Sequence, residues 1–295
     1  MRDIFSKKVI AGVVLLVVII VGIFAFVSWY KKAAPPKINN IVTEIQNTSP
    51  KIKVIGTSVQ GRKIESYTYG NGETHIAFVG GIHGGYEWNS VLLAYQFVDY
   101  LNANPDVIPK NISVSIIPSA NPDGVFKVIG KEGRFTIADI STGVSEAPGR
   151  FNANNVDLNR NFDCKWQATS TWQNKIESAG TSPFSEPEAK AIQSFISENH
   201  PVAVVFWHSK SDAVYASQCS KGILPETLDI MNAYSKASGY PAVKTFDAYV
   251  TTGAAEDWLA SINIPAITVE LKTHETVEWE KNLAGIKALF EYFTL

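Results

Sequence analysis

Two nearly continuous apolar runs, at 202–208 and 266–271, constrain the fold of this chain most strongly. A strand that is apolar along its whole length is typical of a sheet that helices cover on both faces. Apolar residues recur at helical spacing in 87–101, and further helices are indicated at 226–237 and 277–292. Strands that alternate with helices in this way place the chain in the α/β class.

Four shorter segments that precede these runs also have strand-like sequences, at 52–59, 63–69, 75–82 and 112–120. Gln60-Gly61-Arg62 predicts a hairpin turn between the first two, and Asn121-Pro-Asp-Gly124 predicts a turn after the last. We expect a short helix at 41–47 and no regular element in 125–150. Ser185-Glu-Pro-Glu188 predicts a helix that reaches about Asn199, with Ser185 as its cap.

The N-terminal region contains an uncharged apolar run from Val9 to Val27 that continues through Tyr30. The run is long enough to span a bilayer, and it exceeds the ~7–15-residue apolar core of a cleaved signal peptide. Its last residues, Trp29 and Tyr30, suit a membrane interface. We therefore expect a cytoplasmic tail at 1–8, a transmembrane signal-anchor at 9–30, a linker at 31–40 and one catalytic domain at 41–295.

Basic residues flank both ends of this run, so their distribution alone leaves the orientation close to a tie. A short tail ahead of a single span and a large domain still favours a single-pass protein of the cell membrane with an extracytoplasmic domain. No segment of pro-domain size lies between the span and the first predicted strand, so we expect no inhibitory pro-domain.

The charge of the chain argues against a nucleic-acid partner. The whole chain carries a net charge of −2, and its first forty residues are basic, so the remaining domain is acidic. It has two cysteines, Cys164 and Cys219. A domain outside the cytoplasm can join them in one disulfide, and two buried free thiols are the alternative.

His83, Glu87 and His208 have the clearest chemical meaning of any residues in the sequence. Two imidazoles and one carboxylate are the protein ligands of several catalytic zinc sites, which leave a fourth position open. The third ligand comes from a distant predicted strand, so the fold has to bring the three together. Ordinary histidines that bind no metal are the alternative.

Further motifs occur in an order that resembles the zinc metallocarboxypeptidases of the carboxypeptidase A/B (funnelin) type, here as a membrane-anchored, bacterial-like member. The likeness covers about 51–271, and its motifs are 56–62, Gly81-Ile-His83 with Glu87-Trp88, Asn121-Pro-Asp-Gly124, 156–162, Ser185-Glu-Pro-Glu188, His208-Ser209, Tyr249 with Gly253 and Asp257-Trp258, and Thr268-Val-Glu270. The resemblance implies a single domain with a mixed, mostly parallel, twisted central sheet flanked by helices.

The chain departs from this family between its first two metal ligands. Gly84, Gly85 and Tyr86 separate His83 from Glu87, whereas the family usually has two residues there. Because glycine adopts backbone conformations closed to other residues, we expect the loop to bulge and still deliver Glu87.

The resemblance also implies roles for residues at the reacting centre. His83, Glu87 and His208 would hold one Zn²⁺ per chain, and Asp157 would bond His83, which fixes the imidazole tautomer. Glu270 ends a buried strand, where an unpaired carboxylate is costly. We expect it to act as the general base that takes a proton from the attacking water, with a structural ion pair as the alternative.

Three arginines and one asparagine are candidates for binding the substrate. Asn159 and Arg160 are expected to bind a free C-terminal carboxylate, because a guanidinium can donate two parallel hydrogen bonds to it. Arg150 lies nine residues before Asn159, as the oxyanion arginine does in one branch of the family, and Arg134 is a second candidate for that role.

Two residues near Trp258 are expected to contact the leaving residue of the substrate. Tyr249 lies nine residues before Trp258, like the family's mobile tyrosine that covers the substrate. Glu256 precedes Asp257-Trp258, where the family forms the pocket for the C-terminal side chain. A carboxylate there would favour Lys, Arg or a diamino acid such as diaminopimelate, and a glutamate turned to solvent is the alternative.

The sequence therefore predicts a membrane-anchored zinc metallocarboxypeptidase that removes a C-terminal residue from peptides. Three other functions stay open: a cell-wall peptide hydrolase that cuts next to diaminopimelate, an acyl-amino-acid deacylase of the aspartoacylase-like branch, and an inactive binding module. The expected partners are a peptide with a free C-terminal carboxylate and, through the N-terminal helix, the membrane.

Overall fold

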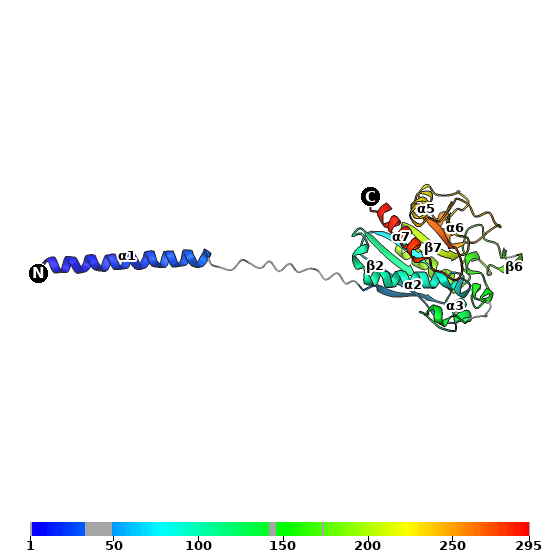
Figure 1. The fold of residues 1–295 in the computed structure, drawn as a ribbon, viewed down its shortest axis with the longest axis horizontal. Coiled ribbons are helices and arrows are strands. Elements are labelled where there is room, and N and C mark those ends of the chain that lie inside the picture. Colours follow the sequence, from blue (N-terminus) through cyan, green and yellow to red (C-terminus); the bar gives the residue numbers. More distant parts are fainter. Residues whose placement is uncertain (1, 33–48, 142–145, 173, 295) are drawn as a thin grey trace. The chain divides into compact units, whose positions relative to one another are not determined.

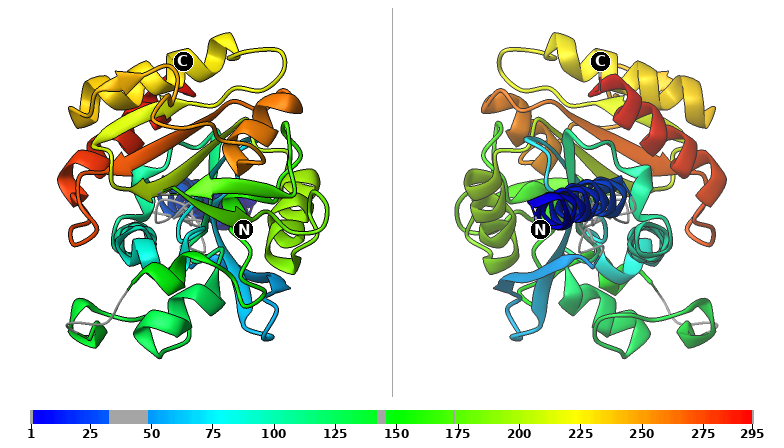
Figure 2. Two further views of the ribbon diagram at one scale, coloured as in Figure 1. Left: turned by 90° about the vertical axis from the view of Figure 1, so that its right-hand side faces the viewer. Right: turned by 90° about the vertical axis from the view of Figure 1, so that its left-hand side faces the viewer.

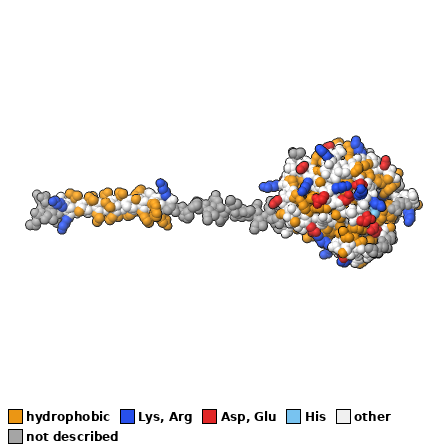
Figure 3. Space-filling model, in the orientation of Figure 1, with side chains coloured by type: hydrophobic (Ala, Val, Ile, Leu, Met, Phe, Trp, Pro, Cys, Tyr) orange, Lys and Arg blue, Asp and Glu red, His pale blue; other side chains and the backbone are white. Residues whose placement is uncertain are grey.

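The computed structural model describes residues 2–32, 49–141, 146–172 and 174–294. The chain divides into two units, Met1–Gln46 and Asn47–Leu295. In the first unit, α1 (Arg2–Lys32) is one continuous helix with apolar side chains around it and basic side chains at both ends (Figure 3). Its segment Ser6–Lys32, with a mean hydropathy of 3.3, is long and apolar enough to cross a membrane. The short helix expected at 41–47 and most of the expected linker lie outside the described residues.

The second unit is built around an eight-stranded sheet with helices on both faces (Figures 1 and 2). Its strands, in spatial order, are β1 (Lys51–Thr57), β2 (Lys63–Gly70), β4 (Ile112–Ile117), β3 (Thr74–Val79), β7 (Ala203–Ser209), β10 (Ala266–Leu271), β8 (Ala213–Ala216) and β9 (Ala242–Val243). The helices are α2 (Trp88–Ala103), α3 (Pro122–Ile129), α4 (Pro187–Asn199), α5 (Pro225–Ser238), α6 (Ala255–Ser261) and α7 (Trp279–Tyr292). A separate hairpin consists of β5 (Thr169–Trp172) and β6 (Lys175–Ser178).

The sheet is mixed, as predicted. The pairings of β3 with β4 and β7, of β7 with β10, and of β8 with β9 are parallel. The pairings of β1 with β2, β2 with β4, and β8 with β10 are antiparallel. The two apolar runs of the sequence thus become neighbouring parallel strands, β7 and β10, in the middle of the sheet. The predicted α/β class is confirmed.

Side chains of β7 alternate between two hydrophobic cores, one on each face of the sheet. Val205 and Trp207 pack in the core that α2, α5 and α7 cover. Val204 and Phe206 pack in the other core, against α4 and α6. Because successive strand residues point to opposite faces, His208 continues the second series. The same alternation in β10 places Glu270 on that face.

Two local predictions were wrong. Asn121-Pro-Asp-Gly124 does not form a turn: Asn121 caps α3, its side chain accepting a hydrogen bond from Gly124 N at 2.9 Å, and the helix runs into a segment where no element was expected. Ser185 is not the cap of α4, which begins at Pro187 after Glu186. The Ser185 hydroxyl instead accepts hydrogen bonds from Thr181 N and Asn161 Nδ2.

Candidate metal centre and active site

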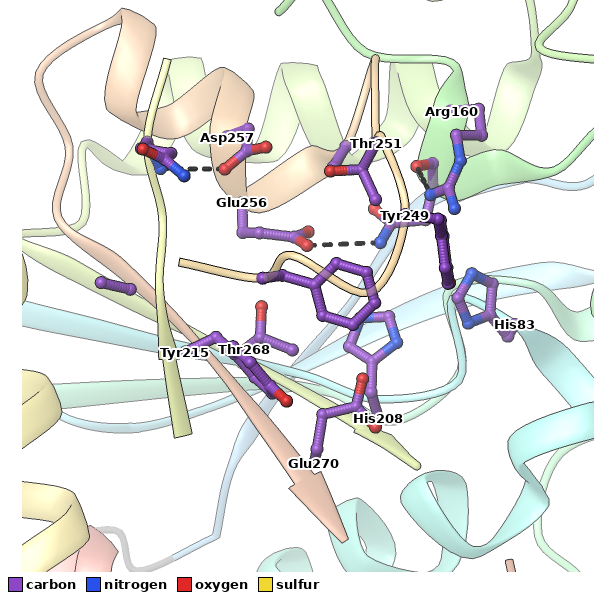
Figure 4. A pocket seen from close by; sticks show the side chains of 15 residues that line it. His83, Arg160, His208, Tyr215, Tyr249, Thr251, Glu256, Asp257, Thr268 and Glu270 are labelled. Atoms are coloured by element: carbon purple, nitrogen blue, oxygen red, sulfur yellow. Dashed lines mark hydrogen bonds between the residues drawn. The ribbon is translucent and has the colours of Figure 1, made fainter. Parts of the chain in front are cut away.

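The carboxyl ends of the parallel strands bring the polar residues of the predicted site to one edge of the sheet. His208 and Glu270 are each the penultimate residue of their strand and are directly paired in the register of β7 and β10. Both side chains therefore lie next to each other on the same face (Figure 4). His83 follows the end of β3 by four residues. Ligands of open α/β sheets usually bind at this edge.

His83, Glu87 and His208 converge on one point. Their ligand atoms all lie within 4.8 Å of one another, and all three residues are buried. His83 Nδ1 is 2.7 Å from Glu87 Oε1, and His208 Nδ1 is 3.1 Å from Glu87 Oε2. Burial alone would lower the pKa of His208, but the Glu87 carboxylate raises it to about 9. Metal binding therefore has to displace a proton from this site.

The additional residue between His83 and Glu87 is accommodated by a short 3-10 turn at Gly84–Glu87. Gly84 has a φ of +47°, and a Cβ there would lie 2.6 Å from Gly149 O. A Cβ at Gly85 would lie 2.6 Å from the Cβ of Val128. Only glycine fits both positions, so the Gly-Gly pair lets the longer loop deliver Glu87 to the two imidazoles.

Asp157 connects the metal ligands with Arg150. One carboxylate oxygen lies 3.3 Å from His83 Nε2, and the other accepts a hydrogen bond from Arg150 Nη2 at 2.6 Å. Burial alone would raise the pKa of Asp157, but the Arg150 and His83 charges hold it well below its usual range. An ionised Asp157 favours the proton on Nε2 of His83, so Nδ1 would be the nitrogen that binds a metal.

Arg150 is held in place by a hairpin that the sequence did not predict. Its Nε lies 3.7 Å from Glu177 Oε2, and its guanidinium carbon lies 4.7 Å from the centre of the Trp172 ring. Glu177 also lies 3.5 Å from Arg160 Nε, so one carboxylate serves both arginines. Trp172 ends β5 and Glu177 lies in β6. The sequences of these two short strands are mixed and polar, so they do not predict a hairpin.

The structure does not bring Arg134 to the site. Its Nη1 donates a hydrogen bond to Asp99 Oδ1 at 2.9 Å on the surface, and its guanidinium lies over the ring of Tyr95. Arg150, in contrast, lines a cavity together with His83 and Glu87. Of the two arginines considered for the oxyanion, only Arg150 lies beside the convergent side chains.

Glu270 lines the cavity beside His208 (Figure 4). Its Oε2 is buried and has no hydrogen-bond partner among the described residues. Burial and the nearby Glu87 carboxylate raise the pKa of Glu270 to about 8. A bound dication would favour the ionised form of the carboxylate. The acidity of Glu270 would therefore depend on whether a metal is bound.

Asn159 and Arg160 lie on the wall of the same cavity. Asn159 Oδ1 accepts a hydrogen bond from Ala255 N at 2.8 Å, which ties it to the start of α6. Arg160 donates from Nη1 to Asn159 O at 2.7 Å and from Nε to Ser170 Oγ at 3.1 Å. No described residue hydrogen-bonds its Nη2. Tyr249, which is 39% exposed, has its ring 6.0 Å from the Arg160 guanidinium and lines the cavity too (Figure 4).

Glu256 lies in α6, a helix that the sequence did not predict, and lines the cavity instead of turning to solvent (Figure 4). Its Oε1 accepts a hydrogen bond from Asn159 Nδ2 at 3.4 Å, and its Oε2 is buried without a partner among the described residues. The neighbouring Asp257 accepts a hydrogen bond from Gln218 N at 2.9 Å. Burial and the Glu256 charge raise the pKa of Asp257 to about 7. This end of the cavity thus contains two neighbouring carboxyl groups, Glu256 and Asp257.

Cys164 and Cys219 form a disulfide in the structure, with Cα atoms 6.0 Å apart. The bond fixes the segment that follows Arg160. Gly253 N donates to Cys164 O at 2.8 Å, and Gly253 O accepts from Phe162 N at 2.9 Å. A Cβ at Gly253 would lie 2.1 Å from Arg160 O. Glycine is therefore required where these two segments of the cavity wall meet.

A family model described as zinc carboxypeptidase matches residues 38–285. The chain belongs to the zinc carboxypeptidase family. This membership confirms the predicted resemblance, the class of zinc metallopeptidase and zinc as the cofactor. The three convergent side chains fit that metal, because they offer two imidazole nitrogens and one carboxylate, and Asp157 already engages the second nitrogen of His83.

The chain is also similar to two bacterial proteins named as an endopeptidase and as an amidase. The chain is 25% identical to "Gamma-D-glutamyl-L-diamino acid endopeptidase 1" of Lysinibacillus sphaericus over 79% of this chain and 63% of that protein. It is 31% identical to "Murein peptide amidase A" of Escherichia coli (strain K12) over 41% of this chain and 50% of that protein. The chain thus spans less than two thirds of the length of these relatives.

The fold is that of solved carboxypeptidases. The crystal structure of carboxypeptidase A from Helicoverpa armigera superposes with a TM-score of 0.65 at 19% sequence identity. The match covers 84% of this chain and 70% of that structure.

Sequence reasoning missed two further residues at the metal centre. Lys210 and His274 line a cavity that also contains His83 and Glu87. Each follows an assigned residue closely, since Lys210 comes two residues after His208 and His274 comes four after Glu270. Their nearness to those residues in the sequence was the signal that could have found them.

Proposed function

We propose that the protein is a zinc-dependent carboxypeptidase that releases the C-terminal residue of peptides and prefers a residue with a cationic side chain. The observation that carries this proposal is one cavity lined by His83, His208, Glu270, Arg160 and Glu256. It combines metal ligands, a base, a cation for a terminal carboxylate and an anion for a side chain.

The position of Arg160 supports removal of a terminal residue. A terminal carboxylate in the cavity could accept from Nη2 of Arg160, which no described residue hydrogen-bonds, with the Asn159 amide beside it. Charge-assisted hydrogen bonds of this kind are strong and directional. A peptide that continued past this point would have an uncharged amide there and would lose that pairing.

In the proposed mechanism, Glu270 acts as the base and Arg150 stabilises the negative charge on the carbonyl oxygen. Zinc, when bound by His83, Glu87 and His208, supplies a Lewis acid that polarises the scissile carbonyl and acidifies water. Glu270 takes a proton from the attacking water and passes it to the leaving amine. The Arg150 guanidinium, fixed by Asp157, stabilises the negative charge that develops on the carbonyl oxygen.

Glu256 supports a preference for a cation on the leaving residue. Its buried Oε2, which has no partner in the part of the chain that the structure describes, is poorly suited to an apolar side chain. Lys, Arg or the free amine of a diamino acid would pair with it.

The names of two relatives favour a second candidate function, hydrolysis of a cell-wall peptide next to a diamino acid. Such a leaving residue presents both a carboxylate and an amine, so Arg160 and Glu256 suit it equally. Digestion of purified cell wall, with analysis of the released products, separates this function from general carboxypeptidase activity.

A peptide-release assay tests the proposal. The zinc-loaded protein should free C-terminal Lys, Arg or diaminopimelate faster than Leu or Phe from otherwise identical peptides. Glu256→Ile should reverse this order, because an apolar pocket rejects a charge that it cannot pair. We expect a change in relative kcat/KM of roughly 30- to 1000-fold, or about 2–4 kcal/mol.

Glu256→Gln is the matched control, since it removes the charge and keeps the shape. It should lose the preference for cations without gaining much activity on Leu. A parent enzyme that prefers Leu or Phe, or an unchanged ranking in Glu256→Ile, would show that another residue sets the specificity. Failure to release any residue, with zinc bound, would overturn the carboxypeptidase function itself.

We also propose that α1 anchors the protein in the cell membrane with the second unit outside. The apolar, 27-residue segment Ser6–Lys32 and the disulfide between Cys164 and Cys219 support this, because disulfides persist in oxidising compartments. Protease added to intact cells should digest the second unit, and the protein should sediment with membranes. Protection until the cells are lysed would reverse the orientation, and recovery in the soluble fraction would remove the anchor.

A further inference from the structure

A second cavity adjoins the first one at the candidate metal centre. It shares His83, Tyr249 and Glu270 with the cavity described above, and its own lining includes Trp172 and Lys210. If the leaving residue occupies the cavity with Arg160, the residue that donates the scissile carbonyl has to extend into this second cavity. We call it the acyl cavity.

Most charged groups of the acyl cavity already have partners. Glu87 lies between His83 and His208, and Arg150 pairs with Asp157. Glu270 faces the reacting water in the proposed mechanism. Lys210, in contrast, makes no hydrogen bond or ion pair with any residue that the structure describes. It is therefore an exposed cation of this cavity that no described residue pairs with.

The backbone next to Lys210 is firmly held. The Ser209 hydroxyl donates to Asn89 Oδ1 at 3.0 Å and lies 2.7 Å from His274 Nδ1. Asn89 is itself fixed by two hydrogen bonds to backbone carbonyls, at Thr273 and Thr276. Both Ser209 and Asn89 are buried. This network fixes the chain at Ser209, so that Lys210 stays at the cavity wall.

We propose that the acyl cavity binds a carboxylate on the residue that donates the scissile carbonyl, and that Lys210 pairs with it. This inference rests on the proposed function, because it assumes that a peptide lies across the two cavities. The two cavities then present side chains of opposite charge, Glu256 and Lys210, to the two sides of the scissile bond. Glu256 lies where the leaving residue would bind and Lys210 where the acyl residue would bind, so the preferred bond joins an acidic residue to a cationic one.

A carboxylate in this position can come from two sources. One is the side chain of an α-linked glutamate, and the other is the free α-carboxylate of a glutamate linked through its side chain. Four peptides that end in Lys distinguish the two sources, and they form two pairs of an acid and its amide. In the first pair the acyl residue is α-linked Glu or α-linked Gln. In the second pair it is γ-linked Glu with its α-carboxylate either free or amidated. The ratio of kcat/KM between each acid and its amide measures the pairing.

We expect the full-length, zinc-loaded protein to prefer the acid over the amide in at least one linkage, by only about three- to tenfold, because Lys210 is exposed to solvent. The linkage that gives the larger ratio of kcat/KM between acid and amide identifies which of the two carboxylates is bound. The preference should shrink as salt is added, since exposed charges are screened. Equal kcat/KM for acid and amide in both linkages would overturn the proposal.

Four variants locate the effect. Lys210→Met should bring the ratio to about one, and Lys210→Glu should invert it, because like charges repel. Lys210→Arg should retain the preference. Lys236→Met removes the same charge from an exposed position near the end of α5 and should leave the ratio unchanged. A preference that survives in Lys210→Met would assign it to another residue and overturn the role of Lys210.

A binding measurement separates this inference from the proposed function. If the protein hydrolyses none of the four peptides, the carboxypeptidase function fails, and the dissociation constants of the same peptides are compared by calorimetry. A preference for the acid that disappears in Lys210→Met would still support the acyl cavity as a carboxylate site. Equal constants, or no binding of any peptide, would overturn it.

Discussion

Replacing Glu270 with glutamine is expected to lower kcat by about a thousandfold or more while the protein keeps its zinc. General acid–base catalysis typically contributes about 10²–10⁴-fold. The amide of glutamine has nearly the same shape as the carboxylate, but it cannot accept a proton from water. Because Glu270 is not one of the three convergent ligands, the metal site itself should be little changed.

The measurement is kcat on a peptide that ends in Lys, together with zinc content by atomic absorption. Glu291→Gln, an exposed position in α7, is the matched control and should have the activity of the parent. Near-normal turnover of Glu270→Gln would remove Glu270 from the role of base. Loss of zinc in that variant would instead point to a direct role in holding the metal.

Replacing His208 with alanine is expected to remove both the metal and the activity. The parent should carry about one zinc ion per chain, since three ligands from one chain converge on one point. Without His208, only His83 and Glu87 remain, and a two-ligand site holds zinc much more weakly. The parent should also release protons on binding zinc, because the Glu87 carboxylate raises the pKa of His208 to about 9.

Zinc content after dialysis and the proton release seen by calorimetry in buffers of different ionisation enthalpy are the two readouts. His200→Asn is the control. His200 is exposed and has a φ of +44°, a conformation that asparagine tolerates. Full activity in metal-free protein, or full zinc content in His208→Ala, would contradict the assignment of this site.

The parts of the fold that the sequence predicted well are those with strong hydrophobic patterns. Both bounds of β10 agree with the predicted run, and β7 begins one residue later than predicted. Each strand fills the space between two helical layers, so almost every position in it has to be apolar. The order of the motifs then indicated that His83, Glu87 and His208 would converge, although they lie on separate segments of the chain.

The parts that were missed depend on contacts distant in sequence. The strands β5 and β6 are short and mostly exposed. They contribute Glu177 to the site, and only folding brings this residue close to Arg150 and Arg160. The helix α6 has seven residues, too few for a clear periodicity. At Asn121 the first turn of α3 uses the same local hydrogen bond as an isolated turn, so the two could not be told apart from the residues alone.

The direct pairing of Glu270 with His208 links folding accuracy to chemistry. If β10 shifted by one residue against β7, Glu270 would turn to the opposite face, into the apolar core beneath α5 and α7. A carboxylate without a partner there would be strongly unfavourable. Misaligned chains would thus be both inactive and unstable, so the residue proposed as the base also protects the sheet against assembly in the wrong register.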